Sequence, residues 1–172
     1  MIPLQRTLIL CAAATGALAT FSSHAAEATF TAALDGASQV PDPVSTKAQG
    51  KLQLQVSADG NQIAYTLTVS NLSNPVSADL HLGPPTANGP LVVKLLSQSA
   101  AVKKGLVNGV LAEGTIGAGD LIGPMLGGSI SELLEQIQAG NAYTNIHTSD
   151  GADPPNSGPG DYRLGEIRGQ IK

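Results

Sequence analysis

Two histidines and one aspartate are the side chains of this sequence whose types and spacing best suit chemistry. Asp79 and His81 are two positions apart, so on an extended strand they project from one face, about 7 Å from each other. A metal ion can bridge them, because carboxylate oxygens and imidazole nitrogens are common ligands. His147 lies in a second alternating segment and adds another imidazole if the two segments pair. The three residues form a ligand set for zinc, copper or iron.

A structural role is the alternative interpretation of the same histidines. His81 stands just before the turn at Gly83, and His147 just before a polar segment that follows Thr148. Imidazoles at such places can hydrogen-bond loop carbonyls. An enzyme site around His81 and His147 is the alternative function. A copper–zinc dismutase centre needs more histidines than the three in this chain, so dismutase activity is not expected.

Two further groups of charged residues have ordinary explanations. Glu166 and Arg168 share one face of an alternating segment, which predicts an ion pair between them. Asp150, Asp153 and Asp161 lie in a segment, residues 149–163, without Val, Ile, Leu, Met or Phe. Their spacing is not that of an EF-hand, so a solvated loop is favoured over a calcium site.

Alternation of apolar and polar residues predicts the strands that position these side chains. The clearest hairpin joins residues 48–56 to residues 63–70 through a turn at Asp59 and Gly60. Tyr143, Asn145 and His147 share one face of a later strand. The other expected strands are residues 28–34, 76–82, 91–96, 106–116 and 165–171.

One short helix is expected late in the chain. Ile130, Leu133, Leu134 and Ile137 recur at helical spacing, and Ser129 with Glu132 has the spacing of a capping box. Such a helix is too short to be stable alone, so it must pack on the strands. The predicted fold class is therefore all-β, an antiparallel Greek-key β-sandwich or flattened barrel with one short late α-helix.

The N-terminus has the features of a signal peptide, predicted to span residues 1–25. Arg6 gives the start a positive charge, residues 8–18 are apolar, and Ser23 and Ala25 are small residues suited to cleavage. Residues 26–172 would then form a single domain, exported to the periplasm or the extracellular space. The only cysteine, Cys11, falls within the signal, so the mature domain would contain no disulfide.

The charge of the chain argues against some partners. The net charge is −4, and it becomes −5 when the signal is removed with Arg6. An acidic surface is a poor match for nucleic acid. The apolar run of the signal is too short to span a bilayer, and no second one follows, so no integral membrane segment is expected in the mature chain. A protein or small-ligand partner is left undefined by the sequence.

Several short segments of the chain resemble the CHRD domain, the module named after chordin. They are Phe30–Gly36, Gln39–Pro41, the strand around Tyr65, Asp79–Gly83, Asn88–Pro90, Gly140–Thr148 and Gly165–Gln170. The resemblance implies a β-sandwich and, in microbes, an exported protein. The chain departs from the family pattern at two places. The family commonly has His-x-His where this chain has Asp79 and His81, and residues 149–164 intervene before the closing motif.

Overall fold

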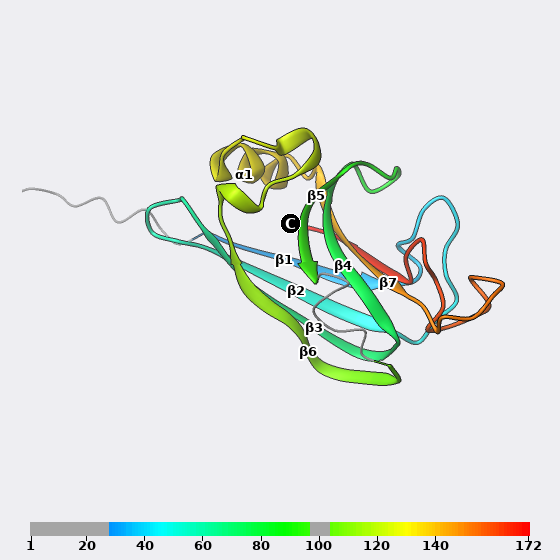
Figure 1. The fold of residues 1–172 in the computed structure, drawn as a ribbon. Coiled ribbons are helices and arrows are strands. Elements are labelled where there is room, and N and C mark those ends of the chain that lie inside the picture. Colours follow the sequence, from blue (N-terminus) through cyan, green and yellow to red (C-terminus); the bar gives the residue numbers. More distant parts are fainter. Residues whose placement is uncertain (1–27, 97–103) are drawn as a thin grey trace, which may run out of the picture.

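The structure is a computed structural model that describes residues 28–96 and 104–172, so the expected signal peptide lies outside the described residues. The described residues contain eight strands (Figure 1). They are β1 (Thr29–Asp35), β2 (Gln49–Val56), β3 (Ile63–Ser73), β4 (Pro75–Leu82), β5 (Leu91–Leu96), β6 (Leu106–Ile116), β7 (Ala142–Thr148) and β8 (Ile167–Gln170).

The strands form one antiparallel sheet in the order β5-β4-β7-β8-β1-β2-β3-β6. The part β8-β1-β2-β3 has the Greek-key form, in which a distant strand returns to lie beside the first of three consecutive strands. In Figure 1 the sheet curls so that β4 and β5 pass in front of β1 to β3, giving a nearly closed, flattened barrel. The all-β fold class predicted from alternation is confirmed.

The interior is built from aliphatic side chains, as the scarcity of aromatic residues requires. In the predicted hairpin, Leu52 of β2 faces Leu67 of β3, and both are fully buried. Their neighbours Lys51 and Gln53 point outward and are exposed. Inward and outward residues thus alternate along β2, which follows from the pleat of a strand with one buried face.

The late helix is α1 (Ile130–Gln138), and it lies at one end of the barrel (Figure 1). Its capping box is formed: Ser129 Oγ accepts the Glu132 amide at 3.3 Å, and Glu132 accepts the Ser129 amide at 2.7 Å. Ile130, Leu133 and Ile137 are buried, whereas Leu134 is half-buried. Two 3₁₀ turns precede it, η1 (Ala118–Asp120) and η2 (Gly123–Met125). Among the described residues, no helix has the length and apolar character needed to cross a membrane.

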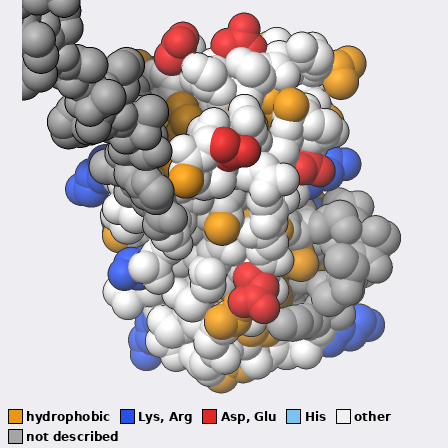
Figure 2. All heavy atoms as spheres, turned by 90° about the vertical axis from the view of Figure 1, so that its left-hand side faces the viewer, with side chains coloured by type: hydrophobic (Ala, Val, Ile, Leu, Met, Phe, Trp, Pro, Cys, Tyr) orange, Lys and Arg blue, Asp and Glu red, His pale blue; other side chains and the backbone are white. Residues whose placement is uncertain are grey.

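Charged side chains are spread over the end of the molecule that Figure 2 shows. Acidic side chains stand apart from one another between neutral atoms, and lysine and arginine side chains lie toward the margins. The described part of this face therefore presents no basic patch.

The pairing of β4 with β7 positions the candidate site. The register places Ser77 opposite His147, Asp79 opposite Asn145, and His81 opposite Tyr143. On both strands the alternate residues face the core; Ala78, Leu80 and Ile146 are fully buried there. The polar and aromatic residues consequently share the outer face of the sheet, where loops cover them.

Candidate metal centre

Asp79, His81 and His147 converge on one point of that outer face. One ligand atom from each residue lies within 4.8 Å of the other two, and His147 Nε2 is 3.6 Å from Asp79 Oδ2. Ligands of a tetrahedral zinc ion stand about 3.4 Å apart, because each is about 2.1 Å from the metal. Small side-chain adjustments would therefore bring all three to coordination distance. The fold brings these residues together; metal binding by them stays a prediction.

Both imidazoles are held through Nδ1 by main-chain carbonyls. His81 Nδ1 lies 3.0 Å from the Gly89 carbonyl oxygen, and His147 Nδ1 lies 2.9 Å from that of Arg163. A carbonyl can only accept, so each Nδ1 carries the hydrogen, and each neutral ring has its lone pair on Nε2. Histidine ligands of metals are commonly oriented in this way. The sequence left open a metal role and a carbonyl-bonding role for the histidines, and one geometry accommodates both.

The Nε2 atom of His81 is buried and has no hydrogen-bond partner in the described part of the chain. A buried nitrogen of this kind normally finds a partner, because removing it from water without one is unfavourable. Burial lowers the pKa of His81, although the Gly89 carbonyl and Asp79 act in the opposite direction. The ring is therefore neutral at pH 7, which is the form that binds metals.

Asp79 supplies the negative charge of the group. Its side chain is nearly buried, and Oδ2 accepts a hydrogen bond from Ser77 Oγ at 3.0 Å. His147 Nε2 lies 3.6 Å from this carboxylate, and His81 is the third residue of the group. A cation between the three residues would be a shared partner for the carboxylate and for the buried His81 Nε2, which has none in the described part of the chain.

His81 forms a stack with the side chains of Tyr143 and Arg168. Tyr143 lies parallel to the His81 ring, with centroids 5.1 Å apart, and the Arg168 guanidinium lies 3.6 Å from the centre of the Tyr143 ring. The Tyr143 hydroxyl accepts the amide of Gly89, the residue whose carbonyl holds His81. The stack and this hydrogen bond together fix the ring of His81.

Arg168 does not pair with Glu166, so that prediction is wrong. Its guanidinium donates to the carbonyls of Pro84 and Ala87 and to Asn88 Oδ1, each at 2.9 Å. Burial lowers the pKa of this guanidinium, which is 1% exposed. Arg168 therefore binds residues 84–88 to the sheet. This loop leads directly to Gly89, whose carbonyl is hydrogen-bonded to His81.

Glu166 is also buried and takes neutral partners. Its carboxylate accepts hydrogen bonds from Thr46 Oγ1 at 2.6 Å, Thr148 Oγ1 at 2.7 Å and the Gly160 amide at 2.8 Å. These donors belong to two different loops and to β7. The two charges were expected to neutralise each other, but each instead ties loops to the sheet over the candidate site.

The three loop aspartates do not assemble into a metal site among the described residues. Asp161 is buried and accepts from the Ser157 amide and hydroxyl, both at 3.0 Å, while the Asp153 side chain is 87% exposed. Residues 149–165 instead fold back over β7, where Tyr162 and Thr148 exchange hydrogen bonds. The favoured solvated loop is thus correct for Asp153 but not for Asp161.

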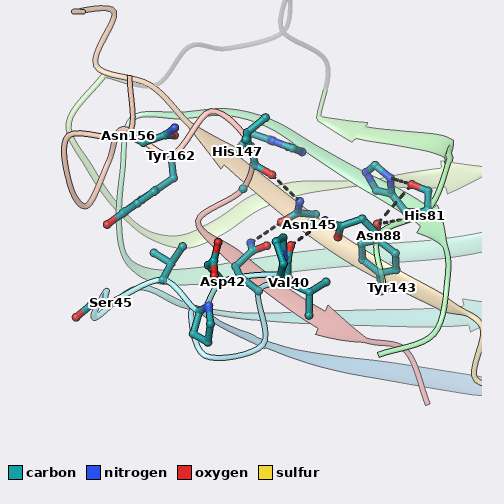
Figure 3. Close-up of a pocket in the computed structure, with 17 residues that line it drawn as sticks. Val40, Asp42, Ser45, His81, Asn88, Tyr143, Asn145, His147, Asn156 and Tyr162 are labelled. Atoms are coloured by element: carbon teal, nitrogen blue, oxygen red, sulfur yellow. Dashed lines mark hydrogen bonds between the residues drawn. The ribbon is translucent and has the colours of Figure 1, made fainter. Parts of the chain in front are cut away.

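The two histidines stand between two cavities. The first, of about 730 Å³, extends from them toward residues 39–45 and Tyr162 (Figure 3). The second, of about 760 Å³, lies on the side of β5 and includes Asp79, Leu91 and Arg163. His81 and His147 line both cavities, whereas Asp79 lines only the second. A metal held here would be accessible to small ligands.

Sequence reasoning did not assign roles to Tyr143 and Ser77. A signal for both was present, since Tyr143 alternates with Asn145 and His147, and Ser77 alternates with Asp79 and His81. The carbonyls of Gly89 and Arg163 gave no such signal, because every residue has a carbonyl and only the fold selects which one is used.

Comparison with protein families gives one match: the model of the CHRD domain matches residues 30–155. The matched residues extend from β1 through β7 and include Asp79, His81 and His147. They end inside the loop that separates β7 from β8, so the closing motif around Arg168 lies outside them. Neither the comparison with curated proteins nor the comparison with solved structures found a match.

Proposed function

The chain belongs to the CHRD domain family, and we propose that this module binds a divalent transition metal, zinc or copper, through Asp79, His81 and His147. Membership of the family supports a structural or binding module. The metal assignment is carried by one observation: one ligand atom from each of the three residues lies within 4.8 Å of the other two. Carbonyl hydrogen bonds at both Nδ1 atoms support it, because they fix the rings in the metal-binding tautomer.

The ligand types favour zinc or copper over calcium or magnesium. The hard cations prefer sites made of oxygen atoms, and this site offers two nitrogens and one oxygen. Three protein ligands leave a tetrahedral ion with one position for water or another ligand. The site would therefore resemble open zinc sites more than closed structural ones.

Calorimetric titration of residues 26–172 with zinc, copper and calcium tests this function. We expect one equivalent of zinc or copper to bind near pH 7 and calcium not to bind. Affinity should fall as the pH drops below about 6.5, because protons compete with the metal for the imidazole nitrogens. The lowered pKa of His81 weakens that competition at this ring, so proton competition there should begin at a lower pH than for a free imidazole. Absence of zinc and copper binding, or an affinity that does not change with pH, would contradict the proposal.

We also propose that the protein is exported and processed. The positive start, the apolar residues 8–18 and the small residues before position 26 support this. N-terminal sequencing of protein collected outside the cytoplasm should begin at Ala26 or Glu27. Exported protein that begins at Met1 would show that residues 1–25 are not a cleaved signal.

A further inference from the structure

The first cavity has an apolar wall that faces the candidate metal centre. Half-buried and exposed side chains from two loops form this wall: Val40, Pro41, Pro43, Val44, Tyr162 and Leu164. The opposite wall is the sheet, with His81, Tyr143, Asn145 and His147 (Figure 3). Leu164 is 83% exposed, so its side chain is available for contact with a ligand. A volume of about 730 Å³ lies within the range of small-molecule sites.

The amide side chains of the cavity already have partners. Gln39 Nε2 donates to Asn145 Oδ1 at 2.7 Å, and Asn88 Nδ2 donates to the Val40 carbonyl at 2.8 Å. Asn145 Nδ2 donates to the Leu164 carbonyl at 3.3 Å. These bonds hold the loops against the sheet, so the amides are poorly placed to recognise a ligand. The lining residues include no lysine or arginine that could attract an anion.

Asp42, an exposed anion, and Ser45 also line the cavity, so the group that would attract an anionic ligand is the proposed metal. Asp79 lines only the second cavity, so its carboxylate approaches from that side and leaves the first cavity for an external donor. A divalent ion with one carboxylate and two neutral imidazoles has a net charge of about +1. A ligand with a single negative charge would neutralise it.

We propose that this cavity binds a small carboxylate with an apolar or aromatic body, whose carboxylate oxygen completes the coordination of the metal. The apolar wall would contact the body of the ligand, and the metal would bind its carboxylate. This inference rests on the proposed metal site, and it adds the chemical class of the ligand.

The test compares three probes on zinc-loaded and metal-free protein: 3-phenylpropanoate, the neutral 3-phenylpropan-1-ol, and propanoate. We expect 3-phenylpropanoate to bind zinc-loaded protein at least about tenfold more tightly than either other probe. Only this probe has both a carboxylate for the metal and a phenyl group for the apolar wall. Metal-free protein should lose this preference. Equal binding of 3-phenylpropanoate with and without zinc, or no binding to zinc-loaded protein, would overturn the inference and leave the metal proposal standing. Failure of zinc itself to bind would overturn both.

Two leucine variants locate the bound body. Leu164→Ser should weaken 3-phenylpropanoate binding by about threefold to tenfold, because the apolar wall loses contact area, and should leave zinc affinity unchanged. Leu126→Ser is the matched control, since Leu126 is 77% exposed and lies beside α1, away from both cavities. Equal effects of the two variants would overturn the placement in the first cavity.

Discussion

Replacing His147 by alanine is expected to weaken zinc binding by more than about 100-fold, because one of three metal ligands is removed. The remaining Asp79 and His81 cannot surround the ion, and water would have to replace the lost nitrogen. His147 is half-buried, and its ring is hydrogen-bonded to the Arg163 carbonyl, so the variant should retain the fold. Calorimetric titration measures the affinity, and circular dichroism checks that the barrel is intact.

Asp150→Ala is the matched control for that variant. Asp150 follows β7 closely in the chain but is exposed, and its carboxylate accepts a hydrogen bond from the Ala152 amide. Its removal should change zinc affinity by less than about twofold, because an exposed charge is screened by solvent and salt. Equal losses in the two variants would mean that zinc is attracted by the overall negative charge of the protein and is not bound by the His147 imidazole.

Replacing Arg168 by leucine is expected to lower the free energy of unfolding by about 3–5 kcal/mol. The variant removes three charge-assisted hydrogen bonds and the contact with the face of Tyr143. It leaves carbonyls of residues 84 and 87 without their donor near the sheet. Denaturant unfolding measures the loss.

Two further variants define what Arg168 contributes. Arg168→Lys keeps the charge but not the planar fork, so it should recover only part of the stability. Arg163→Leu removes a more exposed guanidinium that lies 3.5 Å from the exposed Asp153, and should lower stability by about 1 kcal/mol or less. A loss for Arg168→Leu no larger than for Arg163→Leu would contradict the role of Arg168 as the anchor of residues 84–88.

Much of the fold follows from local patterns in the sequence. The alternation in residues 48–56 and 63–70 specifies a hairpin, and the register observed between Leu52 and Leu67 follows from burying one face. The capping box at Ser129 and Glu132 marks the start of α1 at the residue where it begins. These features depend on neighbours in the chain, which the sequence displays directly.

The candidate site was only partly predictable, because it also depends on contacts between residues that are far apart in the sequence. Alternation placed Asp79 and His81 on one face, but their meeting with His147 depends on the pairing of β4 with β7, which are far apart in the sequence. The partners of Arg168 were not predictable, because its guanidinium is bonded mainly to backbone carbonyls that carry no residue signature. Local spacing suggested Glu166 as its partner, because Glu166 is the nearest opposite charge. The carboxylate of Glu166 instead accepts hydrogen bonds from two threonines and a main-chain amide.

Zinc K-edge X-ray absorption of the protein loaded with one equivalent of zinc tests the metal centre most directly. The geometry predicts a first shell of nitrogen and oxygen at about 2.0–2.2 Å, with outer-shell scattering from two imidazole rings. His81→Ala should reduce that outer-shell scattering to one ring. A spectrum of oxygen neighbours without imidazole scattering would show that zinc, even if bound, is not held by His81 and His147.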